Sequence, residues 1–231
     1  MSIHSKITGS VGHLILDRTE KANAYDRAHL EALEHAVNEL QNHCSVVIIR
    51  SNHPSVFCAG ADLHEMKDAS PEDAARLYSQ AVFSRLARSP FVSIAVVEGL
   101  AIGGGFELAL ATDIRIVGQK GGFRLPETSL GIIPAAGGCT RLTALLGASI
   151  AKQVILAGKD ISAHQAIQWG LAIDGGQSPI DTATQLAQDL STRSTDALLE
   201  AKRIIDLRAE DGSLSEERKA QSKLYALRAD E

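Results

Sequence analysis

The chain has 231 residues, which predicts one large domain or one domain with an appendage, and 45% of them are hydrophobic, which is enough for a proper core. Its net charge of −5 argues weakly against nucleic acid as the main partner, and its three cysteines are too few and too scattered for a disulfide framework. The N-terminus lacks the features of a signal peptide and no stretch approaches a membrane span, so we expect a cytoplasmic protein that does not bind a membrane.

The chain opens with a predicted hairpin and helix. Residues 3–17 predict a β-hairpin that turns at Gly9-Ser10, because Val11, Leu14 and Leu16 supply strand-type apolar positions on its second half. A helix is predicted to begin after the N-cap residue Asp26, since apolar residues recur at helical spacing from Leu30 to Leu40.

A strand, a loop and a second helix follow. Residues 46–49 are β-branched and predict a buried strand, and residues 51–60 are predicted to form a loop. The sequence S-P-E-D, which starts at Ser70, combines an N-cap residue, a proline and two acids, and it predicts a helix that runs to about residue 89.

The most unusual stretch lies between Gly99 and Gly147, which holds eleven of the chain's 19 glycines. An apolar strand is predicted just before it at residues 91–97, and a helix within it at residues 106–111. The triple glycine Gly103-Gly104-Gly105 stands between them. A strand, glycines and a helix in this order point free backbone N–H groups into a cleft.

Two glutamates accompany these N–H groups. Glu107 falls in the first turn of the predicted helix, and Glu127 follows Pro126 in a loop bounded by glycines. Free N–H donors with two nearby carboxylates suit chemistry that develops an oxyanion and moves protons. Taken alone, Glu107 is better explained as an acid that favours the helix dipole, and Glu127 as an ordinary loop acid.

The remaining sequence becomes increasingly helical. Residues 113–117 predict a strand and residues 151–156 a helix. Ser162 with Gln165 forms a capping box for a short helix, residues 171–173 predict one more strand, and the pattern from residue 179 onward is helical. Strands that alternate with helices predict an α/β fold with a largely parallel sheet covered by helices.

The glycine-rich motif is a poor match to nucleotide-binding loops. Leu108 stands where G-x-G-x-x-G requires its third glycine, and there is no G-K-[ST] phosphate loop. The histidines and cysteines show no zinc spacing, so we expect no metal. The small residues C-A-G-A at 58–61 are, by themselves, better explained by tight packing than by ligand binding. That balance changes only when both small-residue loops are considered together.

Three segments carry a resemblance to a known family: F-C-A-G-A-D-L (57–63), A-I-G-G-G-F-E-L-A (101–109) and F-R-L-P-E-T-S-L-G-I-I-P-A-A-G-G (123–138). Their sequences, order and spacing resemble the signature blocks of the enoyl-CoA hydratase/isomerase (crotonase) superfamily, and the chain is most similar to an enoyl-CoA hydratase. The resemblance covers residues 6–202, with K-A-N-A at 21–24 as a weaker early match.

The resemblance implies a crotonase-like ββα spiral in residues 1–175, which carries an acyl-CoA site. It also implies a helical C-terminal region in residues 176–231, which assembles subunits into a homotrimer or a hexamer of two trimers. Coenzyme A would be part of the substrate, and no other cofactor is expected. Family members typically continue beyond the position of Glu231, so we expect either a short member or a more open pocket.

The resemblance also assigns roles to individual residues. Glu107 and Glu127 match the two catalytic carboxylates of hydratases, and the backbone N–H groups of Ala61 and Gly104 match the oxyanion hole. Departures from the family are His64, where hydratases often have lysine, and Cys139, where threonine is common. The expected substrate-binding residues are Ala22, Ala24, Ala59, Ala61, Asp62, Leu63, His64 and Gly104.

The expected activity is therefore hydration of a 2-enoyl-CoA to a 3-hydroxyacyl-CoA, or the reverse dehydration, within fatty acid metabolism. Two alternatives stay open. One is an enoyl-CoA isomerase or another CoA-thioester enzyme that uses the same site, and the other is a non-catalytic scaffold or RNA-binding relative. The presence of both glutamates and the acidic composition favour the hydratase.

Overall fold

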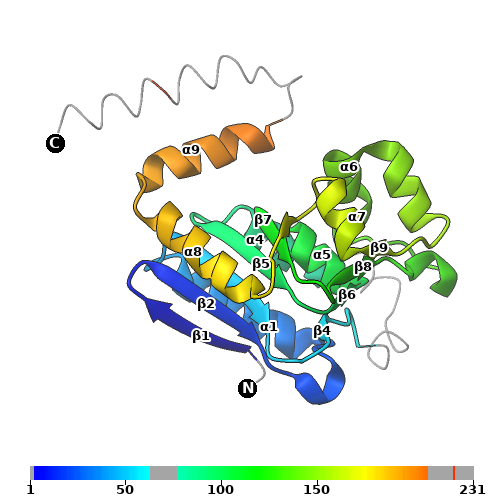
Figure 1. Ribbon diagram of the computed structural model, residues 1–231. Coiled ribbons are helices and arrows are strands. Elements are labelled where there is room, and N and C mark those ends of the chain that lie inside the picture. Colours follow the sequence, from blue (N-terminus) through cyan, green and yellow to red (C-terminus); the bar gives the residue numbers. More distant parts are fainter. Residues whose placement is uncertain (1–2, 63–76, 208–220, 222–231) are drawn as a thin grey trace.

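The computed structural model of the protein describes residues 3–62, 77–207 and 221. These residues form two β-sheets, and helices pack on both faces of the larger sheet (Figure 1). No helix of the described ranges is long and apolar enough to cross a membrane.

The larger sheet has six strands in the order β1-β2-β3-β5-β7-β10. β1 and β2 form the predicted antiparallel hairpin, and from β2 onward neighbouring strands run parallel, which confirms the prediction of a largely parallel sheet. β10 begins two residues later than predicted, because the N–H groups of Leu171 and Ala172 bond instead to the carbonyl of Ala166. The bounds are β1 Ile3–Thr8, β2 Val11–Leu16, β3 Val46–Ser51, β5 Val92–Val97, β7 Ile114–Val117 and β10 Ile173–Asp174.

Alternate residues of the central strands face two separate apolar cores. In β3, Val47 and Ile49 belong to the main core, whereas Val46 and Ile48 belong to a second cluster on the opposite face. This division follows from the alternation of side chains along a strand. The second cluster is closed by α8 (Pro179–Ser191), which lies across the sheet in Figure 1. Burial on both faces explains why these strands are continuous apolar runs.

Helices with one apolar face close the main core on the other side. The helix predicted after Asp26 is α1, and the Asp26 side chain accepts the His29 N–H as its N-cap. The predicted helix start at Ser70 lies outside the described residues. The helix that the structure describes here, α4, begins at Tyr78, because Leu77 with a φ of 16° and a ψ of 76° is not helical, and it ends at Ala87. The helices that contribute to this core include α1 Arg27–Leu40, α4 Tyr78–Ala87, α5 Gly104–Leu110 and α6 Gly138–Ile155.

A smaller sheet of four short strands is the main difference from the sequence-based prediction. Its order is β4-β6-β8-β9, and the segment 51–60, expected to be a loop, contains β4. Two or three residues are too few to show a period along the sequence, so the pattern could not reveal these strands. The bounds are β4 Val56–Cys58, β6 Leu100–Ile102, β8 Gly122–Arg124 and β9 Ile161–Ser162.

The two sheets are built by one repeating path of the chain. Each of β3, β5 and β7 in the larger sheet is followed directly by β4, β6 or β8 in the smaller one. The chain therefore winds as a spiral of strand pairs with intervening helices, as predicted. Because successive turns stack, the ends of β4 and β6 lie side by side.

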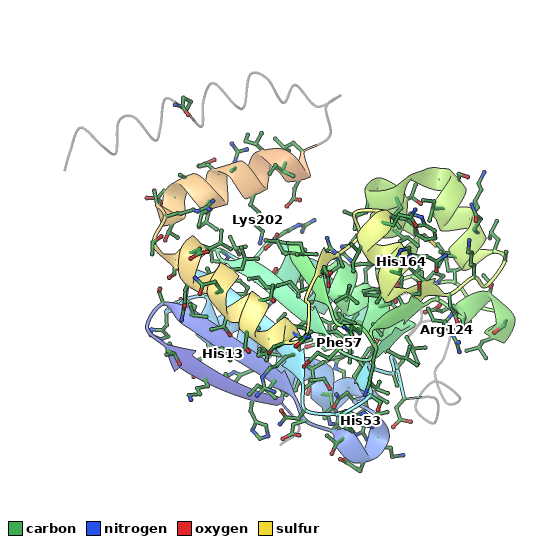
Figure 2. All side chains as sticks on the ribbon, in the orientation of Figure 1. His13, His53, Phe57, Arg124, His164 and Lys202 are labelled. Carbon is green, nitrogen blue, oxygen red and sulfur yellow. The ribbon has the colours of Figure 1, made fainter. Side chains whose placement is uncertain are left out.

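The C-terminal third is helical through α9 (Thr195–Asp206). α6 is longer than predicted and is interrupted at Gly147, whose φ of 77° and ψ of 161° are not helical. The Lys202 ammonium group reaches from α9 to the carbonyl oxygens of Ser89 and Phe91 and to the Asp113 carboxylate (Figure 2). α8 packs directly on the larger sheet, and the division of the chain near residue 175 stays a prediction.

Candidate active site

The two small-residue loops identified in the sequence lie next to each other. β4 and β6 are neighbouring parallel strands in which Cys58 pairs with Ala101. After β4 the chain turns at Gly60, which has a φ of 91°. A Cβ atom at Gly60 would lie 2.8 Å from the Ile102 carbonyl oxygen and 3.1 Å from the Gly104 nitrogen, so glycine is needed for this approach.

Tyr25 holds the loop that carries Ala61. Its N–H donates to the Gly60 carbonyl and its own carbonyl accepts the Asp62 N–H, both at 2.8 Å. These bonds leave the Ala61 N–H on the opposite side of the segment. Among the described residues, neither the Ala61 N–H nor the Gly104 N–H donates a hydrogen bond to another protein group. Both N–H groups can therefore bind a ligand.

Glu107 lies in the first turn of α5, as predicted, and is 4% exposed. Its Oε1 atom accepts a hydrogen bond of 2.8 Å from the Gly138 N–H at the start of α6. Burial raises the pKa of Glu107 to about 7, and the nearby Glu127 charge adds to the rise, while the Gly138 N–H opposes it. Glu107 can therefore hold or release a proton near neutral pH.

Glu127 is the first residue of the 3₁₀ turn η2 (Glu127–Leu130), directly after Pro126. It is 7% exposed, and its Oε2 atom is buried without a hydrogen-bond partner among the described residues. Burial raises its pKa as well. A Cβ atom at Gly103 would lie 3.0 Å from the Glu127 Oε1 atom, which places this carboxylate against the triple glycine.

A pocket of about 280 Å³ brings these groups together. The predicted residues that line it are Ala59, Ala61, Gly104, Glu107 and Glu127. Much of the remaining wall is apolar and comes from Leu77, Ile102, Leu130, Ile132 and Ile133. Two carboxylates and two N–H groups that have no partner in the described part of the chain thus share one largely apolar cavity, which is suited to stabilising an oxyanion and moving a proton.

Of the other predicted binding residues, Ala22, Ala24 and Asp62 belong to the described part of the chain and do not line this pocket. The Ala22 carbonyl accepts the Ala59 N–H at 3.0 Å, and the Ala24 carbonyl accepts a bond from Arg18. Asp62 forms an ion pair with Arg18 at 3.5 Å. Ala22, Ala24 and Asp62 therefore take part in the bonds that support the loop carrying Ala61. Leu63 and His64 lie outside the described residues.

Sequence reasoning missed two contributors to the site. Tyr25 lines the pocket, with its ring packed edge-to-face on Phe83, and its hydroxyl oxygen would be 1.9 Å from a Cβ atom at Gly104. In the sequence, the only feature that could have identified Tyr25 as a site residue is its position directly after K-A-N-A. Gly138 ended a recognised motif, but its bond to Glu107 spans 31 residues and has no local signature.

Comparison with known proteins gives a consistent result. The family model for enoyl-CoA hydratase/isomerase matches residues 6–230. The chain is 38% identical over 212 residues to the probable enoyl-CoA hydratase 2, mitochondrial, of Arabidopsis thaliana, covering 87% of this chain and 70% of that protein. It is 32% identical over 204 residues to the short-chain-enoyl-CoA hydratase of Clostridium acetobutylicum, covering 86% and 78%.

Solved structures agree over nearly the whole chain. The crystal structure of an enoyl-CoA hydratase from Bacillus anthracis has a TM-score of 0.90 and 30% identity, covering 99% of this chain and 95% of that one. An enoyl-CoA hydratase from Thermoplasma volcanium has a TM-score of 0.91 and 28% identity, covering 98% and 93%.

Proposed function

Because the chain belongs to the enoyl-CoA hydratase/isomerase family, we propose that it adds water to the double bond of a 2-enoyl-CoA thioester and forms a 3-hydroxyacyl-CoA, or catalyses the reverse dehydration. The observation that supports this proposal best is the meeting of Glu107 and Glu127 in one pocket with the N–H groups of Ala61 and Gly104. Coenzyme A enters as part of the substrate, and the proposal requires no other cofactor.

The proposed role of the two N–H groups is to bind the thioester oxygen. The carbonyl oxygen of the substrate accepts hydrogen bonds from the Ala61 N–H and the Gly104 N–H. These bonds polarise the conjugated double bond and stabilise the enolate that forms when water adds. Each such donor is typically worth about 3 kcal/mol in the transition state.

The proposed role of the glutamates is to handle the protons. A water between Glu107 and Glu127 attacks the β-carbon, one carboxylate removes its proton, and the other acid, protonated, supplies a proton to the α-carbon. Two carboxylates in one apolar pocket do not both ionise easily. The pKa of about 7 for Glu107 supports this division, because it leaves the proton available near neutral pH.

We propose the same assembly and compartment as the sequence predicts, a homotrimer or a hexamer of two trimers in the cytoplasm. No residue of α9 is fully buried, although the helix carries Leu198, Leu199, Ile204 and Ile205, which supports a further contact for this helix. Light scattering at micromolar concentration tests the assembly, and a monomer would contradict it. Cell fractionation tests the compartment, which matters because the Arabidopsis relative is named as mitochondrial.

The decisive experiment offers the purified protein two substrates. A hydratase lowers the absorbance of the enoyl thioester when mixed with crotonyl-CoA. An isomerase instead raises the same absorbance from a 3-enoyl-CoA by moving its double bond into conjugation. A scaffold changes neither, and a salt-dependent gel shift with RNA would identify an RNA-binding relative. No turnover of crotonyl-CoA or longer 2-enoyl-CoA thioesters by folded protein would overturn the proposed hydration.

A further inference from the structure

The N–H group that bonds to Glu107 belongs to the segment 136–138, and the guanidinium group of Arg141 bonds to this segment. Gly138, whose N–H bonds to Glu107, follows Ala136 and Gly137. Arg141, one turn later in α6, donates from Nη1 to the Ala136 carbonyl oxygen at 2.9 Å. Its backbone N–H bonds to the Gly137 carbonyl at 2.8 Å. The side chain of Arg141 therefore folds back under the segment that contacts Glu107.

The guanidinium group of Arg141 occupies the space in which a side chain at Gly137 would lie. Gly137 has a φ of 119°, a conformation that favours glycine. A Cβ atom at Gly137 would lie 1.9 Å from the Arg141 Nη1 atom. From Nη2, Arg141 also donates to the Ser84 hydroxyl on α4 at 3.3 Å. The guanidinium group thus links α4 to the 136–138 segment.

We infer that Arg141 is a positioning residue, whose guanidinium group fixes the 136–138 segment so that the Gly138 N–H stays bonded to Glu107. This inference rests on the proposed function for its catalytic meaning. It does not require Arg141 to touch the substrate. Arginine suits the role because its planar group can bond the Ala136 carbonyl and the Ser84 hydroxyl at the same time, which the single ammonium group of lysine does less well.

The positive charge of Arg141 also acts on Glu107. The charge of Arg141 lowers the pKa of Glu107, against the larger effect of burial, and the other charged or titratable groups that face Glu107 are Glu127, Cys139 and Tyr25. Arg141 itself faces Glu107, Arg88 and Asp206, and burial lowers its pKa. Removing Arg141 therefore removes both the support of a hydrogen-bond donor and a positive charge next to Glu107.

The test compares Arg141→Met, which keeps length without charge, with Arg141→Lys, which keeps the charge. The first measurement is the titration of the Glu107 carboxyl carbon by NMR in glutamate-labelled protein, with the signal identified by its absence in Glu107→Gln. We expect the Glu107 pKa to rise in Arg141→Met and to rise less in Arg141→Lys. This measurement needs no turnover, so it remains informative if the proposed hydration is wrong.

The second measurement is hydration of crotonyl-CoA. We expect kcat to fall about tenfold to a hundredfold in Arg141→Met, since a misplaced catalytic group costs on this scale, while KM stays within about twofold. In Arg141→Lys we expect a smaller loss. The matched control is Arg85→Met on α4. Arg85 pairs with Glu34 and is not among the described residues that line the pocket, so we expect parental kinetics.

Two further variants separate positioning from stability. Ser84→Ala removes only the contact to α4, so it should lose less activity than Arg141→Met. Adding Arg141→Met to Glu107→Gln should lower the residual rate little further, because residues that act as one unit are not additive. An unchanged Glu107 titration in both Arg141 variants overturns the inference. A Ser84→Ala protein whose kcat falls as far as that of Arg141→Met also overturns the inference. If Arg141→Met does not fold, the Glu107 pKa and the kcat of Arg141→Lys provide the test.

Discussion

The two glutamates of the pocket lie in regions of opposite character. All seven residues of α5, including Glu107, are buried, and Glu107 has a hydrogen-bond donor in Gly138. Glu127 begins η2, whose other three residues are exposed, and its Oε2 atom has no partner within the described ranges. One carboxylate is enclosed by packed structure, and the other is buried at the edge of a turn that faces solvent.

This comparison shows that burial alone does not define the environment of an acid. Burial raises the pKa of both residues, and a peptide N–H opposes the rise in each: for Glu107 it comes from Gly138, 31 residues away, and for Glu127 from its own backbone. A buried oxygen without a partner costs free energy, and a bound water or ligand group would relieve that cost at Glu127. We expect changes around Glu107 to disturb the structure of the site, and changes around Glu127 to affect mainly its chemistry.

The largest expected effect comes from neutralising the carboxylates. If both handle one water, Glu107→Gln and Glu127→Gln each lower kcat for crotonyl-CoA hydration roughly a hundredfold or more, the scale of lost acid–base catalysis. The double variant should be little worse than the poorer single variant. An isomerase would instead lose activity with Glu127→Gln and tolerate Glu107→Gln. A folded Glu107→Gln protein that works at the parental rate would contradict the hydratase proposal.

The next effect is a pH-dependent change in the free energy of unfolding, which we expect to be larger for Glu107 than for Glu127. An acid whose pKa is raised on folding keeps its proton in the folded state while the unfolded chain ionises, so the free energy of unfolding falls as pH rises between the two pKa values. For Glu107 this window runs from 4.5 to about 7, and the loss is about 3 kcal/mol. Glu107→Gln should therefore be more stable than the parent above pH 7.

Chemical denaturation at pH 5 and pH 8 measures this difference. The advantage of Glu107→Gln over the parent should be small at pH 5 and fully developed at pH 8. Glu127→Gln should change in the same direction by less, because its surroundings are more exposed. A Glu107→Gln advantage that does not depend on pH would show that the carboxyl group does not titrate in this window.

The smallest expected effect tests the rigidity of the two regions with one methyl group. In Gly104→Ala the new Cβ atom would lie 1.9 Å from the Tyr25 hydroxyl oxygen and 2.7 Å from its Cζ atom. We expect kcat to fall roughly tenfold to a hundredfold, because the Gly104 N–H, the proposed oxyanion donor, must move.

The matched control for that variant is Gly131→Ala, just after η2. Gly131 has a φ of 76° and no atom would lie within 4 Å of the new Cβ, so the cost is only backbone strain of about 1 kcal/mol. Its kcat should stay close to the parent in the crotonyl-CoA assay. If both alanine variants lose activity equally, the region around Glu127 is as tightly constrained as the region around Glu107.

The same contrast explains what could be predicted from the sequence. The triple glycine and Glu107 form a local strand–glycine–helix pattern, so the N–H groups and the first-turn acid were recognisable from adjacent residues. The hairpin and α1 also follow local patterns of alternation and helical spacing. The meeting of Glu127 with Glu107, in contrast, was expected mainly from the family resemblance and not from its own surroundings.

What the sequence could not reveal depends on contacts between distant residues. β4, β6 and β8 have three residues each, and only their pairing with one another makes them strands. The Tyr25 ring reaches Gly104 because the bridge between Tyr25 and Ala61 places it there. Such contacts follow from the spiral path of the whole chain, and no short window of sequence contains them.

The pairing of Cys58 with Ala101 brings the two small-residue loops side by side. Ala61 and Gly104 each lie three residues beyond this pair, after the turns at Gly60 and Gly103, so the two N–H groups follow the ends of two neighbouring strands. Such strands are about 4.8 Å apart, and two N–H···O bonds of about 2.9 Å that share one oxygen span that distance when they meet at roughly 110°. In the proposed function, a single thioester oxygen accepts both bonds at this spacing, which the main chain sets. Side chains around it, the glutamates included, can be exchanged to alter the reaction while this spacing stays constant.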